Sequence, residues 1–363
     1  MKRCFVLFAA PILLSSVAFS QSIYQQTQSR PISLGTSGGN VNDISHAFCC
    51  SGTLGSLVTK GGVQYILSNN HVLARSGAAS LGEAISQPGL VDSGCSVPPS
   101  DTVAHLSQFI PLGTKNVDAA IAATVSGEVA TNGAILTVGA PSSTIATPSV
   151  GRGVAKAGRT TGLTCSSIGA VNTNVKVQYQ SGCGSGKKFT ETYTNQVLIN
   201  SSSFSAGGDS GSLIVTSDTA QPVALLFAGS SSTTIGNPAS DAATALGVSF
   251  VGGGNHSVTC STGKPGGSGI GHGVSASELD RAMTAKEAHW RELFRDDAIQ
   301  GVGIGEDPDN PGLAAMIIYV EQGRGHGSIP AEIDGVKTVV VITDRFRATG
   351  WNESNEPRSC TQH

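Results

Sequence analysis

Short apolar or alternating runs, each closed by glycine or polar residues, dominate the chain between residues 45 and 252. The stretch 55–70, GSLVTKGGVQYILSNN, holds two β-branched runs around Gly61-Gly62, the pattern of a hairpin closed by a two-residue turn. The runs AILTVG, NTNVKVQYQ, NQVLINSS, GSLIVTS, PVALLFAGSS and ALGVSF continue this pattern, and we find no useful helical period among them. About 200 residues of this kind predict an all-β sandwich or a pair of barrels.

The pattern changes after a Gly/Ser-rich stretch at 253–275, whose composition is that of a linker. Serines begin the segment SASELDRAMTAKEAHWRELFRDDA, which keeps Leu279, Met283, Trp290 and Phe294 near helical spacing. Three strand-like runs follow: IQGVGIG, AAMIIYV and VKTVVVIT. Residues 276–350 are therefore expected to form a small α+β accessory domain, with 351–363 as a C-terminal tail. From Ser277 onward we expect it to fold alone and to carry no catalytic residue.

Charge supports this boundary and excludes some partners. There are 19 charged residues in 41–252 but 24 in the shorter 276–358. The formal net charge of −3 gives no reason to expect nucleic acid or an anionic membrane as a partner. The 363 residues contain 47 glycines and only 5% aromatic residues, which suits short strands joined by tight turns.

The first 20 residues, MKRCFVLFAAPILLSSVAFS, have a basic start, an apolar stretch and a small-residue end. This pattern predicts a secretory signal peptide that is cleaved after Ser20. No later segment approaches the ~20 apolar residues that a membrane-spanning helix needs. We expect a secreted or periplasmic protein, with residues 21–44 as a tail or leader that has no core of its own.

Cysteine usage fits export. Removing Cys4 from the eight cysteines leaves seven, so at least one is free or pairs between molecules. The sequence contains no C-x-x-C and no H-E-x-x-H, so no metal site is expected.

One candidate for chemistry is Ser210, in FSAGGDSGSLIV at 204–215. A serine hydroxyl is a weak nucleophile unless a positioned base takes its proton. Glycines allow backbone N–H groups to converge on a developing oxyanion, and the following strand supplies a rigid support. An ordinary Gly/Ser turn remains an alternative at this point.

A base and its partner can be suggested. His71 follows a strongly apolar strand in VQYILSNNHVLA, where a structural histidine is also common. Asp118, in KNVDAAIAAT, precedes small apolar residues. A carboxylate that is about to be buried needs a partner that offsets its desolvation, and a histidine would serve.

The segments YILSNNHVL, NVDAAIA and GGDSGSL, in this order, resemble the three signature segments of the chymotrypsin/trypsin-like serine peptidases. KAGRTTGLTCSSIGAVNTNVKV resembles the second barrel of secreted bacterial peptidases of the α-lytic and streptogrisin kind. The sequences of these segments, and the presence of a further domain after them, are similar to those of bacterial trypsin-like proteins related to the plant narrow-leaf type. The resemblance covers 45–251 and implies a peptidase domain at 45–252, built as two six-stranded antiparallel β-barrels with the site between them.

The resemblance also implies roles. Ser210 would be the nucleophile, His71 the general base and then acid, and Asp118 the group that orients the imidazole. Backbone N–H groups of Gly208 and Ser210 would form the oxyanion hole. Around the histidine the sequence has NNHV where the family has AAHC, so the family's bracketing disulfide is absent. Asp209 could pair with a newly freed amino terminus, although bacterial relatives often lack this feature.

Two finer expectations concern the second barrel. The bacterial relatives carry a cystine that begins at the matching R-T-T-G-x-x-C position, and we expect a disulfide between Cys165 and Cys183 across a strand pair. The primary specificity pocket would be formed by the segments SSSFSA and LLFAGSSS, which contain no charged residue. The residues expected to bind substrate are Phe204, Ala228, Gly229 and Ser230, although Phe204 could instead fill the core beneath the pocket.

The sequence thus favours a secreted serine endopeptidase that needs no cofactor, acts on polypeptides and cuts after uncharged residues of small to medium size. A non-catalytic binding protein on the same fold and an esterase with the same triad are the alternatives. The physiological substrate, the oligomeric state, an activating role of 21–45 and the pairing of Cys49, Cys50, Cys95, Cys260 and Cys360 are left open.

Overall fold

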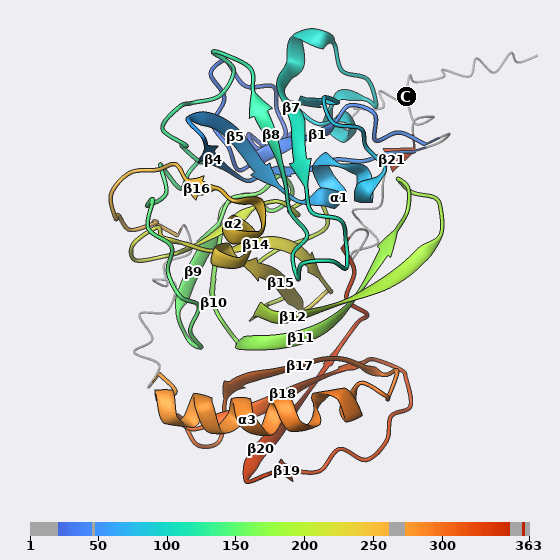
Figure 1. Ribbon diagram of the computed structural model, residues 1–363, viewed down its shortest axis with the longest axis vertical. Helices are drawn as coiled ribbons and strands as arrows, with labels where there is room; N and C mark the ends of the chain where they lie inside the picture. Colours follow the sequence, from blue (N-terminus) through green and yellow to red (C-terminus); the bar gives the residue numbers. More distant parts are fainter. Residues whose placement is uncertain (1–20, 46–47, 261–272, 349–357, 360–363) are drawn as a thin grey trace, which may run out of the picture.

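The computed structural model describes residues 21–45, 48–260, 273–348 and 358–359, so the predicted signal peptide lies outside the described residues. Two curled antiparallel sheets form the upper two layers of the molecule (Figure 1). The first sheet has eight strands in the order β16-β4-β5-β8-β7-β6-β1-β3. Its strands are β1 (Thr36–Asn40), β3 (Gly52–Leu54), β4 (Ser56–Lys60), β5 (Val63–Ser68), β6 (Ala84–Ser86), β7 (Thr102–Phe109), β8 (Ala120–Thr124) and β16 (Ser249–Phe250).

The second sheet has eleven strands in the order β10-β9-β13-β14-β15-β12-β11-β17-β18-β20-β19. Its first seven strands in the chain form the second barrel: β9 (Gly153–Lys156), β10 (Thr164–Ser167), β11 (Ala170–Gln180), β12 (Lys188–Asn200), β13 (Leu213–Thr216), β14 (Pro222–Gly229) and β15 (Thr233–Pro238). The prediction of an all-β double barrel followed by a small α+β region is confirmed.

Local sequence signals place some elements correctly and others not. The hairpin at Gly61-Gly62 joins β4 and β5, and both glycines have the positive φ that this turn requires. AILTVG does not form a strand, because only isolated bridges occur there, at Ile135 and Gly139. The first half of ALGVSF belongs to helix α2 (Ala239–Leu246) and its Gly247 cap, and only Ser249–Phe250 is strand. A short helix, α1 (Asn70–Leu73), follows β5.

The prediction that residues 21–44 form a tail without a core is wrong. Thr36–Asn40 is a buried strand, β1, that pairs with both β3 and β6. Ile32 and Leu34 are fully buried in the core of the first barrel. A Gly/Ser-rich stretch has the composition of a linker, but Gly38 is needed in this strand, since a Cβ there would lie 2.4 Å from Cγ of Leu54.

The C-terminal region has the expected elements, α3 (Ala276–Leu293), β17 (Ile299–Glu306), β18 (Ala314–Glu321), β19 (Glu332–Ile333) and β20 (Val336–Thr343). The Ser275 side chain caps α3 by accepting from the N–H of Glu278, as the sequence predicts. The region is not set apart from the second barrel, however. Strand β17 pairs antiparallel with β11, so the sheet of the barrel continues into it, as Figure 1 shows.

Three disulfides join distant parts of the chain: Cys49–Cys95, Cys50–Cys183 and Cys165–Cys260. The predicted Cys165–Cys183 pair is wrong. The segment between them is not a strand pair that returns to its start. It is mainly β11, an 11-residue strand, which carries the chain about 35 Å from one end to the other at the usual rise. Cys183 therefore reaches the first barrel, while Cys165 meets the segment after β16. Cys360 lies outside the described residues.

Candidate active site

The first barrel brings His71 and Asp118 together. Strands β5 and β8 are paired with Ser68 opposite Ala120, so the residues that follow β5 and precede β8 lie at one end of the sheet. Helix α1 directs the imidazole of His71 toward the carboxylate of Asp118, and the distance from Nδ1 to Oδ2 is 2.6 Å. Both side chains are almost completely buried. A short, dry contact of this kind fixes the ring orientation and favours a proton on Nδ1.

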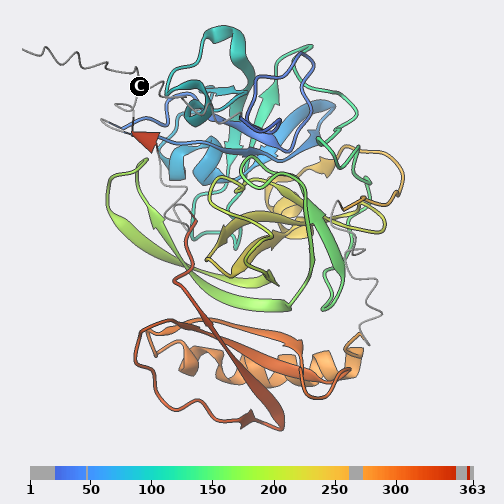
Figure 2. The same cartoon turned by 180° about the vertical axis from the view of Figure 1, so that it is seen from behind.

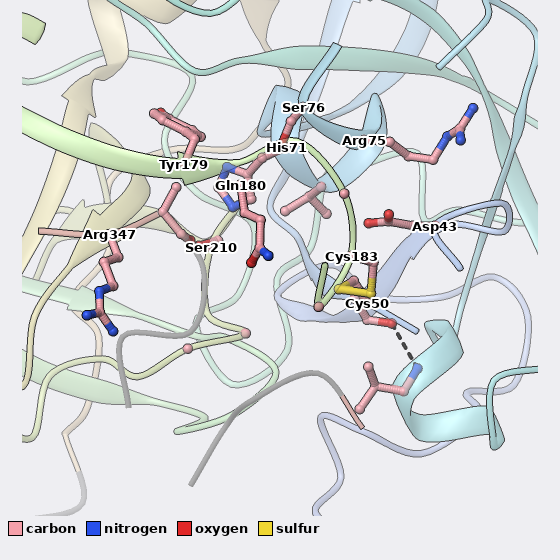
Figure 3. Close-up of a pocket in the computed structure, with 18 of the residues that line it drawn as sticks. Asp43, Cys50, His71, Arg75, Ser76, Tyr179, Gln180, Cys183, Ser210 and Arg347 are labelled. Atoms are coloured by element: carbon pink, nitrogen blue, oxygen red, sulfur yellow. Dashed lines mark hydrogen bonds between the residues drawn. A yellow bond between two sulfur atoms is a disulfide. The ribbon is translucent and has the colours of Figure 1, made fainter. Parts of the chain in front are cut away.

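The second barrel contributes Ser210, in the turn before β13, and the serine lines the same cavity as His71 (Figure 3). The Ser210 hydroxyl donates to the backbone carbonyl of Ala348, at 3.2 Å. Nε2 of His71 has no hydrogen-bond partner among the residues that the structure describes. The structure thus brings the three sequence-predicted side chains to one place, with the serine hydroxyl turned to the C-terminal segment.

Asp118 has a partner that sequence reasoning missed. The hydroxyl of Tyr179, on β11, donates to Oδ2 of Asp118 at 2.9 Å and lies 2.8 Å from the hydroxyl of Tyr193 on β12. Burial and the adjacent Asp118 carboxylate raise the pKa of Tyr179 well above its usual value, so the hydroxyl stays neutral and can donate. Alternation in NTNVKVQYQ could predict an inward-facing tyrosine, but not its partner.

The backbone around Asp118 is also fixed. Its N–H donates to Oδ1 of Asn237 at 2.9 Å, and its carbonyl accepts from Nδ2 of Asn69 at 2.8 Å. Asn237 comes from β15 of the second barrel and Asn69 from the N-cap of α1. The carboxylate is therefore held by both barrels, which limits its freedom to turn away from His71.

A buried ion pair supports the turn that holds the serine. Asp209 is fully buried and lies 3.4 Å from the ammonium group of Lys156, on β9. Its carboxylate also accepts from the N–H groups of Thr160 and Ala206, at 2.8 and 3.0 Å, and from the hydroxyl of Thr161. Asp209 therefore has a complete set of partners within the domain, and no chain terminus is needed to neutralise it.

Gly208 adopts a conformation that favours glycine. Its φ is +95°, and a Cβ would lie 2.4 Å from Oγ1 of Thr160. Within the described residues, neither the N–H of Gly208 nor that of Ser210 donates a hydrogen bond. These two amides were expected to form an oxyanion hole, and that role stays a prediction.

The expected specificity residues have different surroundings. Phe204 is fully buried in the core of the second barrel, which agrees with the alternative that it fills the core. Ala228 is buried on β14. Gly229 exchanges two backbone hydrogen bonds with Arg347, and the hydroxyl of Ser230 lies 2.7 Å from that of Thr343. The C-terminal segment therefore contacts the edge where a substrate was expected.

Asp43 is an acidic residue of the cavity that the sequence did not indicate. Burial raises its pKa to about 6, while the positive charge of Arg75 and the nearby His71 act in the opposite direction. Figure 3 shows Asp43 and Arg75 on the same side of the cavity. In the described parts of the chain, including this cavity, no group of three or more His, Cys, Asp or Glu side chains is arranged to hold a metal ion. No described helix is both long and apolar enough to cross a membrane.

No family model and no curated protein matches the sequence. Solved structures do match. A glutamic-acid-specific serine protease, described as using a histidine triad in substrate binding, is 23% identical, with 60% of this chain and 100% of that chain covered and a TM-score of 0.44. Thermobifida fusca protease A is 18% identical, with 61% and 99% covered and a TM-score of 0.42. Cellulomonas bogoriensis chymotrypsin is 17% identical, with the same coverage and a TM-score of 0.41.

Replacing Tyr179 by phenylalanine should lower kcat about 10- to 100-fold and leave KM nearly unchanged. The variant removes one hydrogen bond to a charged group, worth about 1.5–3 kcal/mol, and the hydroxyl faces Asp118 rather than the cavity. Steady-state kinetics on a short peptide measures both constants. Tyr193→Phe is the matched control, because it removes a hydroxyl that bonds to Tyr179 rather than to Asp118, and its effect should be smaller. Equal kcat values for Tyr179→Phe and the wild type would contradict the role.

Replacing Asp43 by asparagine should stabilise the protein above pH 6. The raised pKa means that the folded state holds the proton of Asp43 more tightly than the unfolded state does. Wild-type stability from this group is therefore complete below about pH 4 and is lost as the pH rises through about 6. Asparagine does not ionise, so Asp43→Asn keeps this stability as the pH rises. Urea unfolding at pH 4, 5, 6 and 7 should give free energies of unfolding that agree for the two proteins at pH 4 and become larger for the variant at higher pH. If the free energies of unfolding of the two proteins changed with pH in the same way, burial would not destabilise the charged form of this carboxylate.

Proposed function

We propose that this chain is a serine endopeptidase that hydrolyses peptide bonds through an acyl-enzyme. The observation that carries the proposal is the buried His71–Asp118 pair, 2.6 Å between Nδ1 and Oδ2, beside Ser210 in one cavity between the two barrels. A fixed imidazole whose second nitrogen has no partner among the described residues, in the same cavity as a serine, suits nucleophilic catalysis. The occupied triad positions favour an enzyme over a non-catalytic binding protein of this fold.

In the proposed reaction, Nε2 of His71 takes the proton of Ser210 as its oxygen attacks the peptide carbonyl. The imidazolium that forms would be stabilised by Asp118, whose carboxylate accepts hydrogen bonds from the hydroxyl of Tyr179 and from the backbone N–H of His71. His71 then gives the proton to the leaving amine, and the same steps with water release the acyl group. The amides of Gly208 and Ser210 would stabilise the oxyanion.

The proposed setting is outside the cytoplasm. Three disulfides are present in the described residues, which suits an oxidising compartment. The signal-like sequence at 1–20 agrees with secretion or with export to the periplasm. The partner would be a polypeptide, and the chemistry of the triad calls for no cofactor.

The proposed specificity is for uncharged residues of small to medium size at the cut site. The segments 201–206 and 225–232 contain no acid to neutralise lysine or arginine and no base to pair with an acidic side chain. Burying an unpaired charge there would cost several kcal/mol. Phe204 lies in the core beneath this region, which makes a deep aromatic pocket unfavourable.

Replacing Ser210 by alanine should lower peptide hydrolysis by roughly 10⁴- to 10⁶-fold, because the nucleophile is lost while the fold remains. A fluorophosphonate should label the wild type at Ser210 and leave Ser210→Ala unlabelled, as peptide mapping of the adduct would show. Ser202→Ala, an exposed position in the loop before the site, is the control and should behave as the wild type does. Unchanged hydrolysis by pure Ser210→Ala would end the assignment.

Cleavage of a peptide library should be dominated by uncharged small to medium residues before the cut. Arg and Lys at that position should be poor, because the segments 201–206 and 225–232 offer no counter-charge. Sequencing of the cleavage products gives the profile directly. A profile led by basic residues would show that an acid from another part of the chain reaches the pocket.

A further inference from the structure

The C-terminal segment that follows β20 enters the catalytic cavity. Figure 2 shows this segment leaving the C-terminal region and rising past the second barrel toward the first. Arg347 and Ala348 are part of the wall that also contains His71 and Ser210, and Arg347 is drawn beside Ser210 in Figure 3. Ala348 is only 1% exposed, so it lies within the cavity rather than over its mouth.

The backbone of this segment pairs on both of its sides. On one side the N–H of Arg347 donates to the carbonyl of Gly229 at 2.9 Å, and the N–H of Gly229 donates back at 3.0 Å. On the other side the N–H of Gln178 donates to the carbonyl of Phe346 at 2.9 Å, and the N–H of Ala348 donates to the carbonyl of Gln178 at 3.1 Å. The segment is an added strand between the ends of β14 and β11, which is how sheet edges bind extended peptides.

The contact extends to the nucleophile. The Ser210 hydroxyl donates to the carbonyl of Ala348, while Nε2 of His71 has no partner in the described part of the chain. The hydroxyl therefore points to a carbonyl of its own chain rather than to the base. Any peptide that used the edge at Gly229 and lay over Ser210 would have to displace residues 346–348.

Several contacts hold the segment in this position. Phe346 is fully buried and packs edge-on against Tyr319 of β18, with ring centres 5.8 Å apart. The C-terminal region is itself fixed to the second barrel, because β17 pairs with β11. The buried ammonium group of Lys286, on α3, donates to the carbonyl of Asn172 at 2.7 Å. A ligand tethered in this way has a high effective concentration at its groove.

The chain is also held on the far side of the cleft. Arg358–Ser359, strand β21, pairs antiparallel with Phe48–Cys49, strand β2, and the two form a small separate sheet just ahead of β3 in the chain. The C-terminal segment thus pairs with the second barrel at 346–348 and with β2 at 358–359. These two attachments are separated by nine residues in the sequence.

We propose that residues 346–348 are a built-in ligand of a peptide-binding groove formed by Gly229 and Gln178, and that they keep the enzyme inhibited while they occupy it. The occupancy follows from the contacts, whereas the inhibition rests on the proposed function. Substrate and segment compete for the same backbone groups. Activity then requires that the segment leave the groove.

Binding of a labelled peptide tests the occupancy without catalysis. The probe is fluorescein-labelled Asp-Arg-Phe-Arg-Ala, the sequence of 344–348, and the protein carries Ser210→Ala throughout. Adding Arg347→Pro removes the N–H that donates to Gly229, while a chain that ends at Thr343 lacks the segment. Arg345→Ala is the matched control, since it loses the same charge but contacts only Glu321 through its side chain. Circular dichroism confirms that each variant is folded.

Fluorescence anisotropy should show at least about tenfold tighter binding to the Arg347→Pro and shortened proteins than to the intact and Arg345→Ala proteins. This is the size expected when one buried backbone acceptor loses its donor. Equal affinity of all four folded proteins, or no binding by any of them, would overturn the proposal.

Activity measurements on the same four proteins, with Ser210 restored, test the inhibition separately from the proposed peptidase function. Hydrolysis of a short peptide should be at least about tenfold faster for Arg347→Pro and for the shortened chain than for the wild type. If these two proteins bind the probe but hydrolyse nothing, the groove assignment stands and the peptidase function fails. If all forms hydrolyse at one rate, the serine chemistry stands and the inhibition is overturned.

Discussion

The arrangement of the candidate active site depends on a direct backbone contact between the two barrels at Ser210. The N–H of Thr53, on β3 of the first barrel, donates to the carbonyl of Ser210 at 2.8 Å, and its hydroxyl donates to the carbonyl of Gly208 at 2.9 Å. The approach is so close that a Cβ on Gly55 would lie 1.9 Å from the carbonyl oxygen of Gly211. Because His71 and Asp118 belong to one barrel and Ser210 to the other, this junction sets the distance between His71 and Ser210.

The long hairpin of β11 and β12 connects most of the other features. It carries Tyr179 to Asp118, and its tip is tied to the first barrel by the disulfide Cys50–Cys183. Near its other end, β11 provides the edge on which β17 docks. One element therefore supports the carboxylate, bridges the cleft and places the C-terminal region. A change in the tilt of this hairpin would alter the contact with Asp118, the bridge to Cys50 and the pairing with β17.

The sequence predicted what depends on neighbouring residues. The turn at Gly61-Gly62 and the cap at Ser275 follow from local conformational preferences, and the two barrels follow from many short strands. His71, Asp118 and Ser210 could be chosen because each sits at the end or start of an apolar run. Partners far apart in the chain could not be found in this way. Cys50 and Cys183 are separated by 133 residues, and nothing near either one indicates the other. The glycine-rich β1 and the docking of the C-terminal region were missed for the same reason, because both depend on surfaces that exist only after folding.

The buried ammonium group of Lys156 has a consequence for how the chain can be extended or trimmed at its start. Since the counter-charge of Asp209 comes from a side chain in β9, the charge balance of the turn around the serine is supplied within the second barrel. A tag or a further domain placed ahead of Gln21 would leave that charge pair untouched. The two ends of the molecule are thus unequal, with a serine turn that is electrostatically independent of the amino terminus and in direct contact with the segment near the carboxyl terminus.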